Sequence, residues 1–160
     1  MIMSKVKYVL RYLTSEYPYG NELSKTRITK MVYLADWYFA QKYKRQMTNI
    51  EWYFDHYGPY VPDVYETAVD DKFLAIKNSY SYYGTPKSVV VINDEYDEIK
   101  IKLNKKEIEV LDKVIEETKD LSWNAFIDRV YSTYPIKESK RYSYLNLVDL
   151  AEDNRTKNNV

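Results

Sequence analysis

The chain has 160 residues, 24 basic and 24 acidic, so its zero formal net charge gives no electrostatic argument for binding nucleic acid or an anionic membrane. It contains no cysteine, which excludes disulfides and thiolate chemistry and fits a reducing cytoplasm. No stretch approaches the roughly 20 apolar residues of a membrane-spanning helix. Residues 1–13 also lack the apolar run and cleavage site of a secretion signal.

Two amphipathic helices are predicted in the first 45 residues. Val6, Val9, Leu10 and Leu13 form one stripe of a helix that stops near residues 17–20, "YPYG". Ser24 is a good N-cap for a second helix that runs to about Arg45. Apolar residues cover much of the circumference of this second helix, so we expect it to be the central one.

The next segment, residues 49–57 ("NIEWYFDHY"), fits a strand, an irregular extended segment or a helix equally well. Gly58-Pro59 breaks it, and we predict a tight reversal there between an extended segment and the next helix. Pro62 suits the first turn of that helix because its missing N–H would have no partner there. The helix carries Val64, Tyr65, Ala68 and Val69 and fades around residues 74–76.

A β-hairpin is predicted between residues 88 and 103. Residues 78–87 resemble a loop, residues 88–93 ("SVVVIN") are rich in β-branched side chains, and "EIKIKL" alternates apolar and polar residues. The intervening acidic stretch "DEYDE" would form the turn and discourage edge-to-edge pairing. Ile99, Ile101 and Leu103 would then lie on one face.

The remaining residues favour three more helices. Asn104 resembles an N-cap with Glu107 three residues on. "DLS" ends that helix, another helix follows until Pro135, and a last short helix covers residues 144–153. The predicted fold class is mainly α (α+β), one compact helical domain of five to six helices with a small antiparallel β-hairpin. We place the domain at residues 1–153 and a frayed polar tail at residues 154–160.

The sequence contains no convincing catalytic or metal-binding pattern. His56 is the single histidine, and a transition-metal site there would have to use carboxylates such as Asp55 or Asp63. No serine lies in a nucleophile elbow, and three glycines cannot build a phosphate-binding loop. We therefore predict no enzyme activity, no cofactor and no metal.

One weak alternative is a Mg²⁺-dependent nuclease. Asp63, Glu98 and Lys100 imitate the P-D … E-x-K pattern, in which two acids hold the metal and the lysine steadies the attacking water. That pattern needs the Asp at the end of a strand beside the E-x-K strand, whereas Asp63 is predicted to open a helix. The basic cluster at residues 42–45 fits a solvated helix end better than a DNA reader, although an autoregulating repressor is a further hypothesis.

Two stretches together resemble a known family. Residues 24–66 resemble the conserved half of the Panacea, or SocA-like, antitoxin domain, and residues 121–153 are similar to the C-terminal half of one branch. The matching positions are Lys30, Met31, Val32, Tyr33, Leu34 and Ala35, followed by Gly58, Pro59, Tyr60, Val61, Pro62, Val64 and Tyr65.

The resemblance implies a helical domain with a small β element that neutralises a toxin by direct protein contact. Family members occur in bacteria and phages, and one delivers its toxin to a protease. For this chain the resemblance implies a non-catalytic, cytoplasmic antitoxin-like protein. The alternative is a phage-encoded inhibitor of a host defence protein, and a protease-adaptor role stays open.

The candidate partner-binding residues come from the motif and from the 19 tyrosines, an excess that suits either a core or an interface. The Gly-Pro motif either docks the second and third helices or contributes His56, Tyr57, Tyr60 and Tyr65 to a recognition groove. Exposed loop tyrosines would extend this surface. The complete set is His56, Tyr57, Gly58, Pro59, Tyr60, Pro62, Tyr65, Tyr80, Tyr82 and Tyr83.

Overall fold

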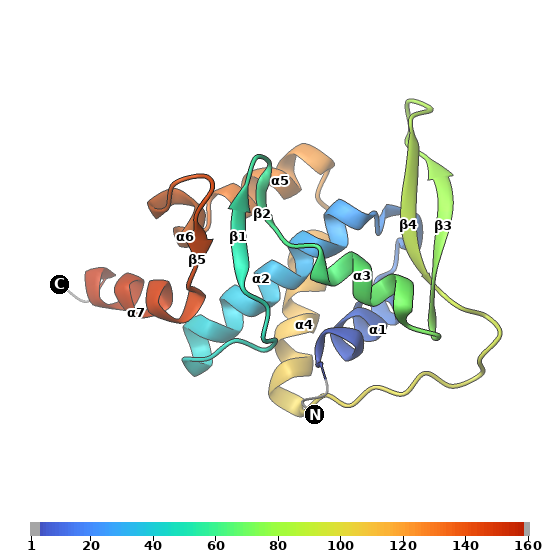
Figure 1. The fold of residues 1–160 in the computed structure, drawn as a ribbon, viewed down its shortest axis with the longest axis horizontal. Helices are drawn as coiled ribbons and strands as arrows, with labels where there is room; N and C mark the ends of the chain where they lie inside the picture. Colours follow the sequence, from blue (N-terminus) through green and yellow to red (C-terminus); the bar gives the residue numbers. More distant parts are fainter. Residues whose placement is uncertain (1–3, 159–160) are drawn as a thin grey trace.

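The computed structural model describes residues 4–158 and has an α+β architecture (Figure 1). Its helices, including one 3₁₀ turn, are α1 (Val6–Glu16), η1 (Gly20–Glu22), α2 (Lys25–Tyr43), α3 (Asp63–Asp70), α4 (Lys105–Thr118), α5 (Trp123–Tyr131), α6 (Tyr134–Glu138) and α7 (Leu147–Asn158). Its strands are β1 (Trp52–Asp55), β2 (Gly58–Tyr60), β3 (Leu74–Tyr80), β4 (Pro86–Ile92) and β5 (Tyr144–Leu145). The predicted mainly helical class is confirmed, with seven α-helices among the described residues instead of five or six.

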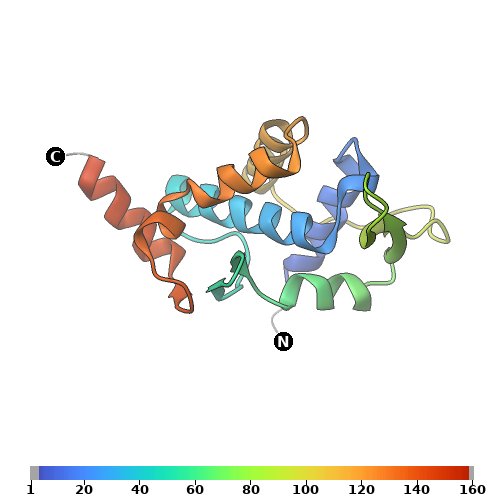
Figure 2. The same cartoon turned by 90° about the horizontal axis from the view of Figure 1, so that it is seen from above.

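The long helix α2 lies at the centre, as its broad apolar face predicts (Figures 1 and 2). Ser24 caps it by accepting a hydrogen bond from the backbone N–H of Arg27 at 3.1 Å. Buried residues occur around most of its circumference, because α1, α3, α4 and α7 all contact it. The predicted N-cap and central position are both confirmed.

A buried carboxylate fixes the chain that leaves α2. Asp36 is fully buried and accepts hydrogen bonds from the backbone N–H and hydroxyl of Thr48 at 2.9 and 2.6 Å. The indole N–H of Trp52 also donates to it at 2.8 Å. These bonds place residues 48–52 against α2, so β1 starts at a defined position. The open question about residues 49–57 is thereby answered: residues 52–55 form a strand.

We predicted that Gly58-Pro59 would form a tight reversal between an extended segment and the next helix. This prediction is wrong, because the two residues begin a second strand, β2. In the three-stranded sheet of order β2-β1-β5, Asp55 pairs with Gly58, so His56 and Tyr57 form the two-residue turn. Gly58 has φ +100°, a conformation that glycine adopts without strain, and starts β2. Pro59 follows in the short edge strand, where a missing N–H is tolerated. The chain then enters α3 at Asp63.

The second hairpin also differs from its prediction. β3 pairs with β4, with Leu74 opposite Ile92 and Tyr80 opposite Pro86, around a turn at Gly84 with φ +79°. Residues 74–76 therefore belong to a strand rather than to a helix end, and the predicted loop at residues 78–87 is wrong at both ends, since residues 78–80 belong to β3 and residues 86–87 to β4. Residues 99–103, the predicted second strand, are irregular. The prediction failed because the glycine turn and the backbone bond from Val90 N–H to the Leu23 carbonyl place β4 beside the body, away from residues 98–103.

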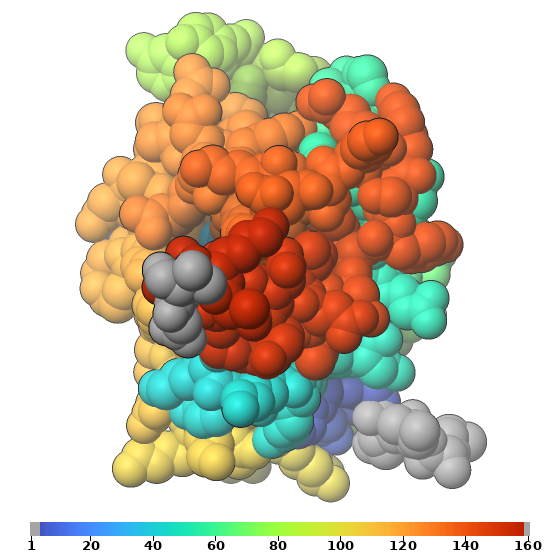
Figure 3. Space-filling model, turned by 90° about the vertical axis from the view of Figure 1, so that its left-hand side faces the viewer, coloured from blue at the N-terminus to red at the C-terminus, as the bar shows by residue number. Residues whose placement is uncertain are grey.

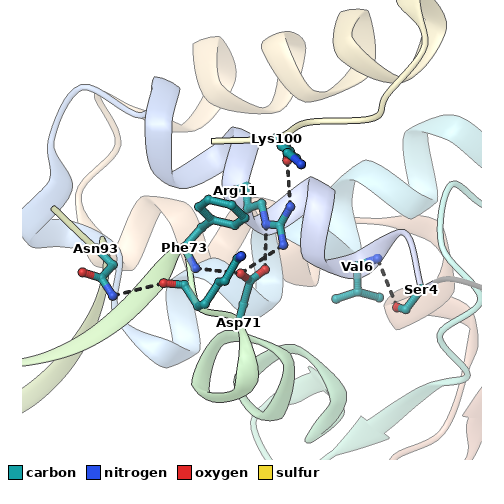
Figure 4. Close-up of polar contacts among 8 residues, drawn as sticks. Ser4, Val6, Arg11, Asp71, Phe73, Asn93 and Lys100 are labelled. Carbon is teal, nitrogen blue, oxygen red and sulfur yellow. Dashed lines mark hydrogen bonds and ion pairs between the residues drawn. The ribbon is translucent and has the colours of Figure 1, made fainter. Parts of the chain in front are cut away.

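A buried ion pair anchors the base of this hairpin (Figure 4). The guanidinium of Arg11 donates to both carboxylate oxygens of Asp71, at 2.8 and 3.1 Å, and to the Lys100 carbonyl at 2.8 Å. Asp71 also accepts the backbone N–H of Phe73, whose ring lies 4.4 Å from the Arg11 guanidinium carbon. One cluster therefore joins α1, the end of α3 and the irregular segment 93–104.

The C-terminal third confirms one prediction and corrects three. One correction concerns the last helix, predicted over residues 144–153: residues 144–145 form β5 instead, and α7 begins at Leu147. Asn104 and Glu107 form the predicted capping box of α4. Pro135 lies in the first turn of α6 instead of ending α5, which stops at Tyr131. α7 continues through Asn158, and Arg155 donates to the Gln41 carbonyl at 2.9 Å, so residues 154–158 are helical rather than frayed. Residues 159 and 160 of the predicted tail lie outside the described residues.

Candidate functional site

The turn between β1 and β2 carries a group of exposed aromatic side chains, His56, Tyr57 and Tyr142, which we call the corner cluster. The His56 ring nitrogen Nδ1 lies 3.0 Å from the Tyr142 hydroxyl, and the Tyr57 ring lies edge-on to His56 at 4.5 Å. Tyr57 is 75% exposed and Tyr142 is 60% exposed. Tyr142 was not predicted, because it enters the cluster from a segment 86 residues away.

The rest of the Gly-Pro motif is mostly scaffold. Gly58 and Pro59 are buried, and so are Val61 and Val64. A Cβ on Gly58 would lie 3.4 Å from the Tyr131 ring, which shows how closely α5 covers this turn. These motif positions therefore hold β2 and α3 against α2 and α5, as the docking interpretation predicts.

A row of tyrosines crosses the small sheet beside this corner. Tyr53 pairs with Tyr60 of β2 on one side and Tyr144 of β5 on the other. These rings border a cleft of about 800 Å³, whose other lining residues are Asn49, Glu51, Asp55, Val61, Pro62 and Asp63. Carboxylates beside phenol rings suit the ammonium or guanidinium group of a partner protein.

The four residues predicted to share one groove occupy different places. Tyr60 lines the cleft, whereas His56 and Tyr57 belong to the corner cluster. Tyr65 is not among the residues that line the cleft, and the Lys25 ammonium lies 4.6 Å from its ring centroid and 5.8 Å from that of Tyr60. The structure thus brings Tyr60 and Pro62 to the cleft but leaves Tyr65 at its flank.

A buried lysine lies behind the sheet. Lys30 of α2 is 2% exposed. Burial lowers the pKa of its ammonium to about 8, and the charge of Asp55 opposes part of that change. Asp55 also lines the cleft. Lys30 is a position of the family motif, but the motif did not indicate that its side chain is buried.

The end of the β3–β4 hairpin carries a second aromatic group, Tyr80, Tyr82 and Tyr83, which we call the arm cluster. Their exposed fractions are 66%, 96% and 90%. The rings of Tyr82 and Tyr83 meet edge to face, with centroids 5.3 Å apart. All three tyrosines were predicted to be exposed in this region.

The two clusters project from the same side of the molecule. The β1–β2 turn and the β3–β4 tip both point upward in Figure 1. In Figure 3, which faces the C-terminal helix, both hairpin ends again lie at the top of the molecule, at opposite sides. One partner could therefore contact both ends without wrapping around the protein.

The alternative nuclease pattern lacks its structural context. Asp63 opens α3, and Glu98 and Lys100 lie in an irregular segment, not on a strand that adjoins Asp63. Within residues 4–158, no three His, Cys, Asp or Glu side chains are grouped closely enough to hold a metal ion. No helix in this part of the chain is both long and apolar enough to cross a membrane.

Comparison with known proteins identifies one family. The family model described as "Antitoxin SocA-like, Panacea domain" matches residues 28–135, more than half of the chain. The match includes the Gly-Pro motif and the β3–β4 hairpin and ends before Tyr142. No curated protein and no solved structure matches the chain.

Proposed function

The chain belongs to the SocA-like, Panacea-domain antitoxin family, and on this premise we propose that it neutralises a partner toxin by direct protein–protein contact, without catalysis. The observation that carries the proposal is the arm cluster. Two adjacent tyrosine rings, at least 90% exposed, stand at the end of a projecting hairpin. Tyrosine is enriched at binding hot spots, because a large ring becomes buried while its hydroxyl finds a polar partner.

The arrangement of the arm cluster favours binding further. Tyr82 and Tyr83 already contact each other edge to face, so part of their side-chain freedom is lost before a partner arrives. The Ser81 N–H donates to the Thr85 carbonyl at 2.8 Å and closes the turn below them. A partner would therefore meet ordered rings on a closed turn.

The corner cluster supplies the second end of the proposed surface. The contact between His56 and Tyr142 joins the β1–β2 turn to the segment before β5. The N–H of Tyr142 also donates to the Phe54 carbonyl at 2.6 Å, which fixes its φ at +67°. Such a strained tyrosine, held exposed, is typical of a functional surface.

The proposal can be tested with the product of the adjacent open reading frame as the candidate toxin. We would co-express the two proteins, measure host growth, and measure complex formation by size-exclusion chromatography. The test variant is Tyr82→Ala/Tyr83→Ala. The matched control is Tyr19→Ala, which removes a half-exposed tyrosine outside both clusters.

We expect the wild type and Tyr19→Ala to restore growth and to co-elute with the toxin, whereas the double variant fails in both assays. Toxin abundance separates two mechanisms: direct inhibition leaves it unchanged, and delivery to a protease lowers it. If the neighbouring product is harmless and a host defence protein is bound instead, the antitoxin proposal is wrong and the inhibitor alternative replaces it.

A further inference from the structure

The two edges of the β3–β4 hairpin differ in how they are covered. β4 faces the body: the N–H of Val90 donates to the Leu23 carbonyl at 2.9 Å, and Ser24 bridges to Val89. β3 lies on the outer side, away from the central helices (Figure 1). Its seven residues form a strand edge with no other strand beside it among the described residues.

The register identifies which β3 backbone groups point outward. In an antiparallel pair, opposite residues alternate between exchanging two hydrogen bonds and exchanging none. Because the Val90 N–H points to Leu23, Val90 exchanges none with Ile76. Ile76, and by alternation Asn78 and Tyr80, therefore direct their N–H and C=O groups away from β4.

Two further bonds agree with this assignment. The Asn93 N–H donates to the Phe73 carbonyl, and the Ser81 N–H donates to the Thr85 carbonyl. On the β3 side of the hairpin, the odd-numbered positions 73 and 81 therefore bond across to the other side. Pro86, which has no N–H, lies opposite Tyr80. By the same alternation this pair exchanges no hydrogen bonds, so the missing N–H breaks none. The six outward groups of Ile76, Asn78 and Tyr80 have no protein hydrogen-bond partner within residues 4–158.

Charge favours one kind of occupant for this edge. Residues 74–92 contain two lysines, Lys77 and Lys87, and no acidic residue. Lys87 donates to the Asn21 carbonyl at 2.8 Å, whereas the exposed Lys77 belongs to β3 itself. A strand laid beside β3 would place its side chains next to Lys77, and opposite charges on neighbouring strands stabilise such a pair.

We propose that the free edge of β3 receives an extended, acidic segment of the partner protein, which adds a third strand to the hairpin. The added strand would bond to Ile76, Asn78 and Tyr80, and its end would reach the arm cluster. Main-chain bonds would supply affinity, and Lys77 and the tyrosines would supply selectivity. This inference rests on the proposed partner-binding function and names the mode of contact.

A second copy of this chain suits the edge less well. If two β3 strands paired around Asn78, each would bring Lys77 and Lys87 toward an identical hairpin without an acidic residue. Like charges on adjacent strands destabilise the pairing. A lysine on an exposed edge strand is also a common device against self-association.

The test exploits the direction of one N–H group. Asn78→Pro removes an outward N–H and leaves every β3–β4 bond in place, whereas Asn78→Ala removes the side chain and keeps the N–H. We expect Asn78→Pro to weaken binding of the co-expressed toxin at least about tenfold, because it removes one bond and its ring obstructs the added strand. Asn78→Ala should bind within about twofold of the wild type. Hydrogen exchange at Lys77 and Ser79 checks that the hairpin is intact.

A second measurement needs no toxin. A capped seven-residue peptide of alternating Glu and Val serves as the probe, and its counterpart with Lys in place of Glu serves as the control. We expect the acidic peptide to slow amide exchange at Ile76, Asn78 and Tyr80 by at least about tenfold, and the basic peptide to leave it unchanged. Equal effects of both peptides, or no effect of either at millimolar concentration, would overturn the acidic-strand proposal.

The outcomes separate this inference from the proposed function. If the toxin binds Asn78→Pro as tightly as the wild type, antitoxin function stands and the strand addition is wrong. If no toxin binds any variant but the acidic peptide protects the three amides, the antitoxin function is wrong and the edge still accepts an acidic strand. Concentration-dependent protection of the same amides without peptide would show that a second copy occupies the edge, and would overturn the proposal.

Discussion

The two hairpins both carry a glycine with positive φ and exposed tyrosines, but the body of the protein covers them to different degrees. At the β1–β2 corner, α5 covers the glycine and proline, and the buried Asp36 network positions the preceding chain. The β3–β4 arm is anchored at its base by Arg11 and Asp71 and is free along one edge and at its tip. Family motif residues therefore mainly hold the scaffold, and the least covered backbone and aromatic groups lie on the arm.

Because the two hairpins are covered differently, we expect substitutions in them to affect stability and binding differently. Changes at the corner or at the anchors should lower the free energy of unfolding. Changes at the tip of the arm should leave stability intact and alter binding.

Breaking the anchor of the arm should have the largest effect. Arg11→Met leaves the Asp71 carboxylate buried without its cation and should cost about 3–5 kcal/mol. Arg11→Met/Asp71→Leu removes both charges and should recover part of this loss. Urea denaturation of the two variants measures the difference, and a double variant less stable than Arg11→Met would contradict the role given to the ion pair.

Changing the carboxylate behind the corner should have the next largest effect. Both carboxylate oxygens of Asp36 accept hydrogen bonds from N–H or O–H groups of Thr48 and Trp52. In Asp36→Asn the amide NH₂ would replace one of these oxygens, and a donor would then face another donor. We expect a loss of roughly 2–3 kcal/mol, measured by urea denaturation at pH 7. Asp36→Asn with wild-type stability would show that the network does not hold the corner.

The buried Asp36 carboxyl group should also make the free energy of unfolding depend on pH. Burial raises the pKa of Asp36 to about 6 from its usual 3.8, so the folded state retains the proton longer than the unfolded state does. Its contribution to stability is complete below about pH 4 and is lost as the pH rises through about 6. The stability difference between wild type and Asp36→Asn should therefore be larger at pH 4 than at pH 7, and a difference independent of pH would contradict the raised pKa.

Two glycines allow a direct comparison of the hairpins. Gly58→Ala and Gly84→Ala both put a Cβ on a residue with positive φ, which should cost about 1 kcal/mol or more in each case. Gly58 also faces the Tyr131 ring at 3.4 Å, whereas no atom lies within 4 Å of the Gly84 position. Thermal unfolding should show a larger loss for Gly58→Ala, and equal losses would mean that the corner is no more tightly packed than the arm.

The tip of the arm should tolerate truncation. Tyr82→Ala/Tyr83→Ala removes two rings that are almost fully exposed, so the free energy of unfolding should change by less than about 0.5 kcal/mol per residue. Thermal unfolding checks this. A substantial loss would show that the rings support the hairpin, and the arm cluster would then be a structural feature.

Local sequence signals predicted the helices well, and long-range contacts explain the errors. Ser24 and the Asn104–Glu107 capping box mark helix starts with bonds made within four residues. The partner of β4 could not be predicted in this way, because residues 98–103 alternate apolar and polar side chains as a partner strand would, whereas β3 has three consecutive polar residues at 77–79. The choice depends on Leu23, more than 60 residues before β4.

The candidate site was predicted in part for the same reason. The motif located the corner, and composition located the exposed arm tyrosines. Tyr142 and the row of Tyr53, Tyr60 and Tyr144 come together through the pairing of β1 with β5, which no local pattern encodes.

The most direct test of the account is a calorimetric titration of the candidate toxin into Tyr82→Ala/Tyr83→Ala. We expect a dissociation constant at least about 30-fold higher than that of the wild type, equal to about 2 kcal/mol, because two hot-spot rings are lost. The thermal midpoint should match the wild type. A dissociation constant equal to that of the wild type, in a variant that folds normally, would contradict the claim that the arm is the binding surface.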